Sequence, residues 1–311
     1  MWVDDKFFSI ISELKSKSEN ELFLNMRNCF LTKVPIPIQD VLSDYWSKYP
    51  YWGSYSFKEN NFDIFHQKAK VFKDYVNDIV WLYDRLEDYR SKFALYAVLS
   101  NFYYFDFECL KKAKEQLYSQ YFDLDILNNV SDEIFVDVGT YYGETILDFI
   151  KCFGEDSYKK IYGYEITPAV VEKAKKSLSN FHNIEILNKA VGESIGKVFL
   201  KENSVSNSAN QVEYDGKIEI DKISLDEDIK SNISMIKMDI EGGEIDAIKG
   251  CEKHIRNDCP KLMISAYHSN SDFVVIPKII ESIRNDYKFY FRYYGGNLYA
   301  TELVLYCIKN L

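Results

Sequence analysis

The sequence predicts an α/β fold, in which a helical N-terminal region precedes a mostly parallel, doubly wound sheet that ends in an antiparallel hairpin. Three observations predict it. Apolar residues recur at helical spacing up to about Asn129, and from Val130 onward short apolar runs alternate with helical stretches. Two β-rich segments close the chain around the turn Gly295-Gly296-Asn297. Strands that alternate with helices imply right-handed crossovers, so a parallel sheet is expected up to the hairpin.

Residues 1–129 are predicted to form a helical domain, which could be a lid, a dimerisation element or an acceptor-binding module. One apolar stripe lies in residues 71–83, and a second runs from Phe93 to Tyr104. Two stretches, Pro35-Ile36-Pro37 and Pro50-Tyr51-Trp52-Gly53, interrupt the helical pattern, so several helices joined by loops are expected. An aromatic cluster could stack on a sugar ring or pack between helices; it comprises Trp46, Tyr49, Tyr51, Trp52 and Tyr55.

Residues 130–311 are predicted to form the second domain. Thr167 and Pro168 are expected to begin a helix, with Thr167 as its N-cap. Short apolar runs bounded by polar residues or glycine predict buried parallel strands at 134–138, 161–164, 184–187, 234–238 and 261–266. Helical spacing predicts helices at 144–153, 245–251 and 272–284, and the hairpin is predicted at 287–294 and 301–308.

The overall charge and the cysteines exclude some classes of function. A formal net charge of −10 over 311 residues makes nucleic acid an unexpected partner, although a local basic patch could exist. The six cysteines have no zinc-binding spacing and are predicted to be buried and reduced. The first residues are acidic, and no apolar run is long enough for a membrane span, so a cytoplasmic protein is expected.

The loop after the first predicted strand is the expected cofactor site, because ligands of such sheets bind beyond the carboxyl ends of the strands. A dinucleotide site would need a Gly-x-Gly-x-x-Gly loop against the diphosphate. Here Tyr141 and Tyr142 stand between Gly139 and Gly143, and Glu144 opens the helix. The bulk of the two tyrosines and the negative charge of Glu144 disfavour a diphosphate at this loop. S-adenosylmethionine carries a sulphonium and an ammonium instead, which suit nearby acids.

Acidic residues also follow two further predicted strands. Glu165 comes directly after 161–164, where a carboxylate could accept hydrogen bonds from both ribose hydroxyls. Asp239, Glu241 and Glu244 follow 234–238. These carboxylates could bind a metal, but the sequence shows no complete set of metal ligands, so no metal is predicted. Glu244 and Glu241 could instead balance a helix dipole. Glu165 in register with the first loop favours a methyl-donor site.

With these residues assembled, the chain from about Val130 onward resembles the FkbM-type methyltransferases, whose fold is a Rossmann-like methyltransferase sheet. The resemblance also extends to a helical lead-in at about 78–122. The matching motifs are Phe135-Val136-Asp137-Val138-Gly139 with Gly143-Glu144-Thr145, Asn188-Lys189-Ala190-Val191-Gly192, Ile236-Lys237-Met238-Asp239-Ile240-Glu241-Gly242, Ser265-Ala266-Tyr267-His268, and Glu302-Leu303-Val304-Leu305-Tyr306. The family commonly has a histidine where Tyr293 stands and Glu-Thr where Glu302-Leu303 stands, so acceptor contacts there are in question.

The resemblance implies transfer of a methyl group from S-adenosylmethionine to a hydroxyl of a sugar, nucleotide-linked sugar or similar metabolite, as in polysaccharide biosynthesis. It implies that Asp137, Gly139 and Gly143 line the methionine end, that Glu165 binds the ribose, and that Ala190 and Val191 line the adenine. The donor site is expected to include also Thr140, Tyr141, Glu144, Thr145, Ile166 and Asp239. The acceptor site is expected to include Lys237, Glu241, Tyr267, His268 and Arg292.

Methyl transfer to a hydroxyl also requires a base. His268 follows a predicted strand, and an unperturbed histidine has a pKa of about 6.5, which suits neutral pH. Asp239 is the alternative base, and His268 could also be structural. Two other classes stay open: a nucleotide-sugar oxidoreductase, and a non-catalytic scaffold that retains the fold. A homodimer could form through the helical region.

Overall fold

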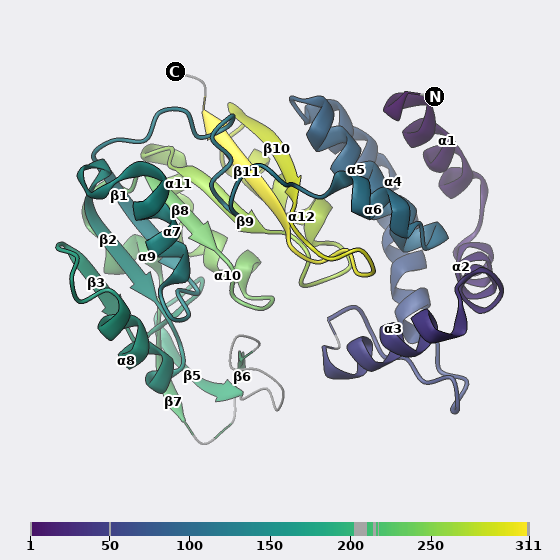
Figure 1. Cartoon of the computed structure of the whole chain (residues 1–311), viewed down its shortest axis with the longest axis horizontal. Coiled ribbons are helices and arrows are strands. Elements are labelled where there is room, and N and C mark those ends of the chain that lie inside the picture. Colours follow the sequence, from purple (N-terminus) through teal and green to yellow (C-terminus); the bar gives the residue numbers. More distant parts are fainter. Residues whose placement is uncertain (1, 50, 202–209, 214–215, 217, 310–311) are drawn as a thin grey trace. The chain divides into compact units, whose positions relative to one another are not determined.

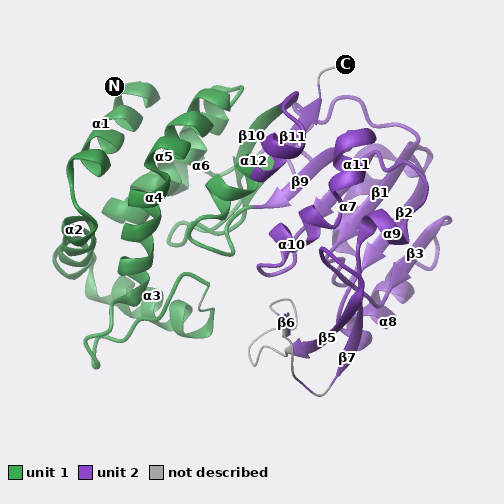
Figure 2. Cartoon of the chain, turned by 180° about the vertical axis from the view of Figure 1, so that it is seen from behind, with its two compact units in different colours: residues 1–116, 266–278, 288–305 green, residues 117–265, 279–287, 306–311 purple. Residues whose placement is uncertain are grey.

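The computed structural model describes residues 2–49, 51–201, 210–213, 216 and 218–309. The chain divides into two compact units, which are coloured separately in Figure 2. Unit 1 comprises residues 1–116, 266–278 and 288–305, and unit 2 comprises residues 117–265, 279–287 and 306–311. The predicted division into 1–129 and 130–311 stays a proposal.

Most of unit 1 is helical, as the apolar spacing predicts (Figure 1). Its helices are α1 (Val3–Ser16), α2 (Glu19–Lys33), α3 (Ile36–Lys48), α4 (Asp63–Arg85), α5 (Tyr89–Tyr104) and α6 (Phe107–Ala113). Polar caps set several of these boundaries: Ser18 and Glu21 form a capping box at α2, and Asp88 accepts a hydrogen bond from the Ser91 N–H at α5. Pro37 lies in the first turn of α3, so the predicted break is confirmed.

The apolar stripe predicted in 71–83 faces the core of unit 1. Phe72, Val76, Ile79, Leu82 and Tyr83 of α4 are buried. In the aromatic cluster, Trp46 and Trp52 are also buried, with only 3% and 2% of their surfaces exposed, so these two side chains pack inside the unit. Pro50, which belongs to the same stretch, lies outside the described residues.

The predicted α/β architecture is confirmed: one seven-stranded sheet has the strand order β10-β11-β9-β8-β1-β2-β3. Strands β1, β2, β3, β8 and β9 are parallel, and the β10 and β11 hairpin is antiparallel. The strands are β1 (Glu133–Val138), β2 (Tyr158–Tyr164), β3 (Ile184–Leu187), β8 (Met235–Met238), β9 (Lys261–Ser265), β10 (Tyr287–Tyr293) and β11 (Leu303–Lys309). The helices are α7 (Glu144–Phe153), η1 (Glu155–Ser157), α8 (Pro168–Ser177), α9 (Leu225–Asp228), α10 (Glu244–Lys249), α11 (Glu252–Asn257) and α12 (Asp272–Ile283).

A second, four-stranded sheet was not predicted. Its order is β4-β7-β5-β6, and its strands are β4 (Ala190–Val191), β5 (Gly196–Lys201), β6 (Gln211–Glu213) and β7 (Glu219–Ile223). These strands are short and rich in Lys, Glu and Asp, and β7 alternates buried with exposed positions. The apolar runs that mark the central strands are therefore missing, and the sequence pattern is closer to that of a loop.

Two details of the predicted elements differ from the structure. Helix α8 begins after Thr167 as predicted, but the Thr167 side chain does not cap it; its hydroxyl accepts a hydrogen bond from the Asn210 amide at 3.0 Å. The six cysteines are free, but Cys152 and Cys259 are half-buried rather than buried. Among the described residues, no helix is long and apolar enough to cross a bilayer.

Candidate methyl-donor site

The predicted donor residues of unit 2 come together because three parallel strands end at one edge of the sheet. In the strand register, Asp137 on β1 pairs with Gly163 on β2 and with Lys237 on β8. The residues that follow these strands, Gly139 and Glu165 among them, therefore lie at the carboxyl edge. This is where ligands bind in open α/β sheets.

A buried ion pair joins the ends of β1 and β8. The Lys237 ammonium lies 3.0 Å from the Asp137 carboxylate and donates a 2.6 Å hydrogen bond to the Gly139 carbonyl. The two side chains are 2% and 0% exposed. Burial raises the pKa of the Asp137 carboxyl, and Lys237 opposes that rise. Burial lowers the pKa of Lys237, but the carboxylates of Asp137 and Asp239 outweigh this effect and raise it overall.

The loop after β1 has a conformation that requires glycine. Gly139 has φ +83°, and a Cβ there would lie 1.9 Å from the Asp239 carbonyl oxygen. Gly143, the N-cap of α7, has φ +92°. Tyr141 between them also has a positive φ of 50°, which costs energy for a residue with a side chain. The loop thus packs closely against Asp239, the residue that follows β8.

Glu165 follows β2 and is 8% exposed. Its Oε2 accepts a hydrogen bond from the Tyr141 N–H at 3.1 Å, and its Oε1 accepts one from the Thr167 N–H at 2.8 Å. Burial raises the pKa of Glu165, and these two N–H donors oppose that rise. A carboxylate has about four acceptor positions, so Glu165 keeps capacity for the two hydroxyls of a ribose.

The residues predicted near the adenine lie in the second sheet. Ala190 of β4 belongs to a buried apolar cluster, and Ile166 packs against that cluster; its other members are Val198, Leu200 and Ile220. Val191 is also buried. An apolar wall next to Glu165 has the chemistry that a purine ring requires.

The remaining predicted donor residues of this loop and of the first turn of α7 are Glu144, Thr140, Thr145 and Tyr141. Glu144 accepts a hydrogen bond from the Tyr142 N–H at 3.1 Å, so it stabilises the loop that precedes its own helix. The Thr140 hydroxyl donates to the Asp137 carbonyl at 2.9 Å, and Thr145 is half-buried in the first turn of α7. The rings of Tyr141 and Tyr142 lie 4.0 Å apart.

The acidic segment after β8 contains one contact that sequence reasoning missed. The Tyr121 hydroxyl donates to Asp239 Oδ2 at 2.8 Å and lies 3.1 Å from the Ser265 hydroxyl. Glu244 accepts hydrogen bonds from the N–H groups of Ile240 and Gly242, so it holds the loop between β8 and α10. Its balancing of the helix dipole stays a prediction. The Glu241 carbonyl accepts from the Gln211 amide at 2.7 Å.

Three predicted acceptor residues, Tyr267, His268 and Arg292, belong to unit 1. The Trp52 indole N–H donates to the Tyr267 carbonyl at 2.8 Å. His268 is 4% exposed, and its ring centroid lies 4.1 Å from that of Tyr267 and 5.4 Å from that of Tyr51. The Trp52 hydrogen bond holds the backbone next to His268, and the two rings contact its side chain.

Arg292 is buried and holds a two-pronged ion pair with Asp88, at 3.2 and 2.7 Å. It also donates to the Ser91 hydroxyl at 3.0 Å. Its guanidinium therefore has structural partners at the start of α5. Acceptor binding by Arg292 stays a prediction.

Comparisons with known proteins agree with this geometry. The model of the methyltransferase FkbM domain family matches residues 137–291. A crystal structure of methyltransferase FkbM from Methylobacillus flagellatus KT is similar at 24% identity with a TM-score of 0.66, covering 79% of this chain and 62% of that one. This chain thus spans less than two thirds of that protein. No curated protein sequence matches the chain.

Two other solved structures are more distantly similar. They are an rRNA methylase from Streptococcus thermophilus, at 15% identity with a TM-score of 0.37, covering 58% of this chain and 89% of that one, and Aeropyrum pernix fibrillarin with bound S-adenosyl-L-methionine, at 11% identity with a TM-score of 0.36, covering 58% and 67%. The family match agrees with the sheet architecture and with the predicted donor residues at its carboxyl edge. Residues 137–291 of this chain belong to the methyltransferase FkbM domain family.

Proposed function

We propose that this chain transfers a methyl group from S-adenosylmethionine to a hydroxyl oxygen of a sugar, a nucleotide-linked sugar or a glycan-type metabolite. The observation that carries the donor part is Glu165, a buried carboxylate with unused acceptor capacity beside a loop that requires Gly139. The buried acids around that loop favour a cationic ligand over a diphosphate. This supports a methyltransferase over a nucleotide-sugar oxidoreductase.

When bound, S-adenosylmethionine supplies an electrophilic methyl group on a positively charged sulphur, so the chain mainly has to bind, orient and accept a proton. Glu165 would hold the ribose end, and Asp137 with the Gly139 loop would hold the methionine end. His268 would accept the proton of the acceptor hydroxyl when that oxygen takes the methyl group, with S-adenosylhomocysteine as the other product. Asp239 is the alternative base, but its Oδ2 already accepts a hydrogen bond from Tyr121.

The acceptor and cellular context are also proposals. Lys237, Glu241, Tyr267 and Arg292 are proposed to contact the acceptor. The helical residues 1–129 are proposed as a lid, acceptor-binding or dimerisation domain, and the enzyme is proposed to work in the cytoplasm in polysaccharide biosynthesis. Buried Trp46 and Trp52 are not part of a sugar-stacking surface.

Calorimetry with S-adenosylhomocysteine tests the donor site. Glu165→Gln should weaken binding about 10- to 100-fold, because a charge-assisted hydrogen bond is worth roughly 1.5–3 kcal/mol. Glu185→Gln is the matched control: Glu185 is an exposed residue of β3 paired with Lys160, and its substitution should leave binding unchanged. In the same series, His268→Ala should keep donor binding and lose turnover of nucleotide-linked sugars with a labelled donor.

Equal affinity of Glu165→Gln and the wild type would remove Glu165 from the site. A wild-type protein whose melting temperature rises with NAD and not with S-adenosylhomocysteine would instead be an oxidoreductase. A protein that responds to neither would be the non-catalytic scaffold.

A further inference from the structure

A cavity of about 260 Å³ lies within unit 1, where the beginning of α5, the end of α6 and β10 meet. It is lined by Tyr89, Arg90, Phe93, Ala94, residues 112–115 and residues 291–293. The Glu115 N–H donates to the Tyr293 carbonyl at 2.7 Å, so the segment after α6 is fixed to β10. The cavity is therefore built on hydrogen-bonded backbone.

The lining of this cavity is cationic although the whole chain carries a net charge of −10. Arg90 is paired with Glu115, and Arg292 is paired with Asp88. Lys112 and Lys114 are exposed, and in the described part of the chain no carboxylate lies within ion-pair distance of either. Two ammonium groups without a neutralising partner thus line one cavity, and such a pair attracts a multiply charged anion.

An aromatic surface adjoins these cations. Tyr89 and Phe93 are one helical turn apart on α5, and their rings are nearly parallel, with centroids 6.2 Å apart and 3° between their planes. Tyr89 is 58% exposed, so its ring is open to a planar ligand. Any nucleobase can stack on such a ring, because every base has a flat aromatic face.

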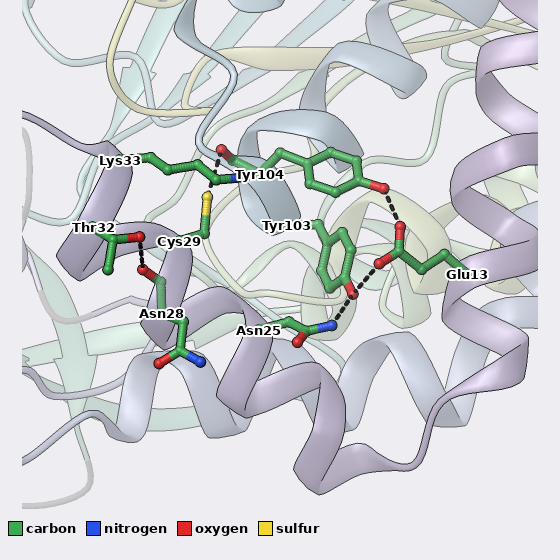
Figure 3. Close-up of a pocket in the computed structure, with 8 residues that line it drawn as sticks. All are labelled: Glu13, Asn25, Asn28, Cys29, Thr32, Lys33, Tyr103 and Tyr104. Carbon is green, nitrogen blue, oxygen red and sulfur yellow. Dashed lines mark hydrogen bonds between the residues drawn. The ribbon is translucent and has the colours of Figure 1, made fainter.

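A second cavity of unit 1, shown in Figure 3, has different chemistry. It is lined by residues of α1, α2 and α5, and its carboxylate, Glu13, accepts hydrogen bonds from Tyr103 at 2.9 Å, from Tyr104 and from Lys17. Lys17 neutralises Glu13, so among the lining residues of this cavity Lys33 is the one cation left. The cavity beside α6 differs from it in having two lysines, Lys112 and Lys114, in its lining.

We propose that the cavity lined by Lys112, Lys114 and Tyr89 binds the nucleoside diphosphate part of a nucleotide-linked sugar. The two lysines hold the diphosphate and the Tyr89 ring stacks on the base. The volume accommodates the diphosphate and part of the nucleoside, and the base rests on the exposed ring. This inference rests on the proposed methyl transfer only in the identity of the sugar that the nucleotide carries.

Calorimetry tests the site without any turnover. It measures the binding of UDP, uridine and inorganic pyrophosphate to the full chain. The wild type should bind UDP, and Lys112→Ala/Lys114→Ala should weaken both UDP and pyrophosphate roughly tenfold or more. Tyr89→Ala should weaken UDP and leave pyrophosphate unchanged. Lys175→Ala/Lys176→Ala is the matched control, because it removes two exposed lysines of α8 and should leave UDP binding as in the wild type.

The inference is overturned if UDP does not bind the wild type, if the Lys112/Lys114 variant binds UDP as the wild type does, or if pyrophosphate binds as tightly as UDP. S-adenosylhomocysteine binding in the same samples keeps the two proposals apart. Retained donor binding without UDP binding would remove this cavity and leave the methyl-donor site intact. UDP binding without donor binding would do the reverse.

Discussion

Two ion pairs, a half-buried one in unit 1 and a fully buried one in unit 2, shift the pKa of their carboxyl groups in opposite directions. In unit 1 the Asp88 carboxylate receives both prongs of the Arg292 guanidinium and also the Ser91 N–H at 2.7 Å. Burial raises the pKa of Asp88, but the hydrogen bonds from Arg292 and Ser91 outweigh it and lower the pKa overall. In unit 2 the Asp137 carboxyl has its pKa raised by burial, even with Lys237 at 3.0 Å.

The difference lies in how many donors each carboxylate has. Within the described residues, no backbone N–H donates to Asp137, whereas Asp88 has three donors including the N–H that it caps. A carboxylate buried with one cation and little else is costly, because its desolvation is incompletely compensated. Such an arrangement stabilises the fold poorly but suits a site that receives a cationic ligand. The pair of Asp88 and Arg292 has the donors that a stabilising ion pair requires.

The largest effect is expected from breaking the pair in unit 2. Lys237→Met leaves Asp137 buried beside Asp239 without a counter-charge, and this should lower the free energy of unfolding by about 3–5 kcal/mol. Urea unfolding measures the loss, and calorimetry should show that S-adenosylhomocysteine binding is lost as well. Adding Asp137→Asn should recover much of the stability but not the binding.

Recovery of donor binding in that double variant would show that the Asp137 charge serves the fold only. A Lys237→Met protein with wild-type stability would show that Asp137 is protonated in the folded chain. Either result would remove the contrast between the two pairs.

A smaller effect is expected in unit 1. Arg292→Met removes the two guanidinium hydrogen bonds to Asp88. The Asp88 side chain is 34% exposed, so water can partly replace these hydrogen bonds. The free energy of unfolding should fall by about 2–3 kcal/mol, and S-adenosylhomocysteine affinity should not change. Arg292→Lys should recover little, because an ammonium cannot reproduce the two-pronged geometry. A tenfold loss of donor affinity in Arg292→Met would contradict the separation of the two roles.

The sequence predicts the donor edge well because its signals are local. Gly139 and Gly143 lie where the backbone has positive φ, and Glu165 directly follows a buried strand. Each of these residues can therefore be predicted from the strand and loop next to it in the sequence. Parallel pairing then brings distant strand ends together without further information. The architecture of the seven-stranded sheet follows from the same alternation of short apolar runs and helices.

Contacts that depend on distant chain segments are not predictable in this way. Tyr121 has no periodic pattern around it, yet it reaches Asp239 from 118 positions away along the chain. The second sheet is missed because its strands are short and rich in charged residues. The ion pair of Arg292 with Asp88 joins residues 204 positions apart, and only the fold reveals that this arginine has a structural partner.

Lys68 on α4 is buried among aromatic rings. It is 3% exposed, and its ammonium lies 4.2 Å from the Phe102 ring centroid and 5.2 Å from that of Trp52. Within the described residues no carboxylate lies within ion-pair distance of it, so the rings are its main electrostatic contacts. Burial lowers the pKa of Lys68 to about 7.

This burial should make the stability of the chain depend on pH. The unfolded chain binds a proton at Lys68 up to about pH 10.4, whereas the folded chain releases it above about pH 7. Because the unfolded state binds more protons in this window, the free energy of unfolding should rise with pH, by up to about 1.4 kcal/mol per pH unit. Below pH 7 both states are protonated, and the full cost of burying the charge remains.

Urea unfolding from pH 6 to 9 should show this rise in the wild type and its loss in Lys68→Met. Lys70→Met, at an exposed position of the same helix, should keep the rise; a slope that persists in Lys68→Met would assign it to another group.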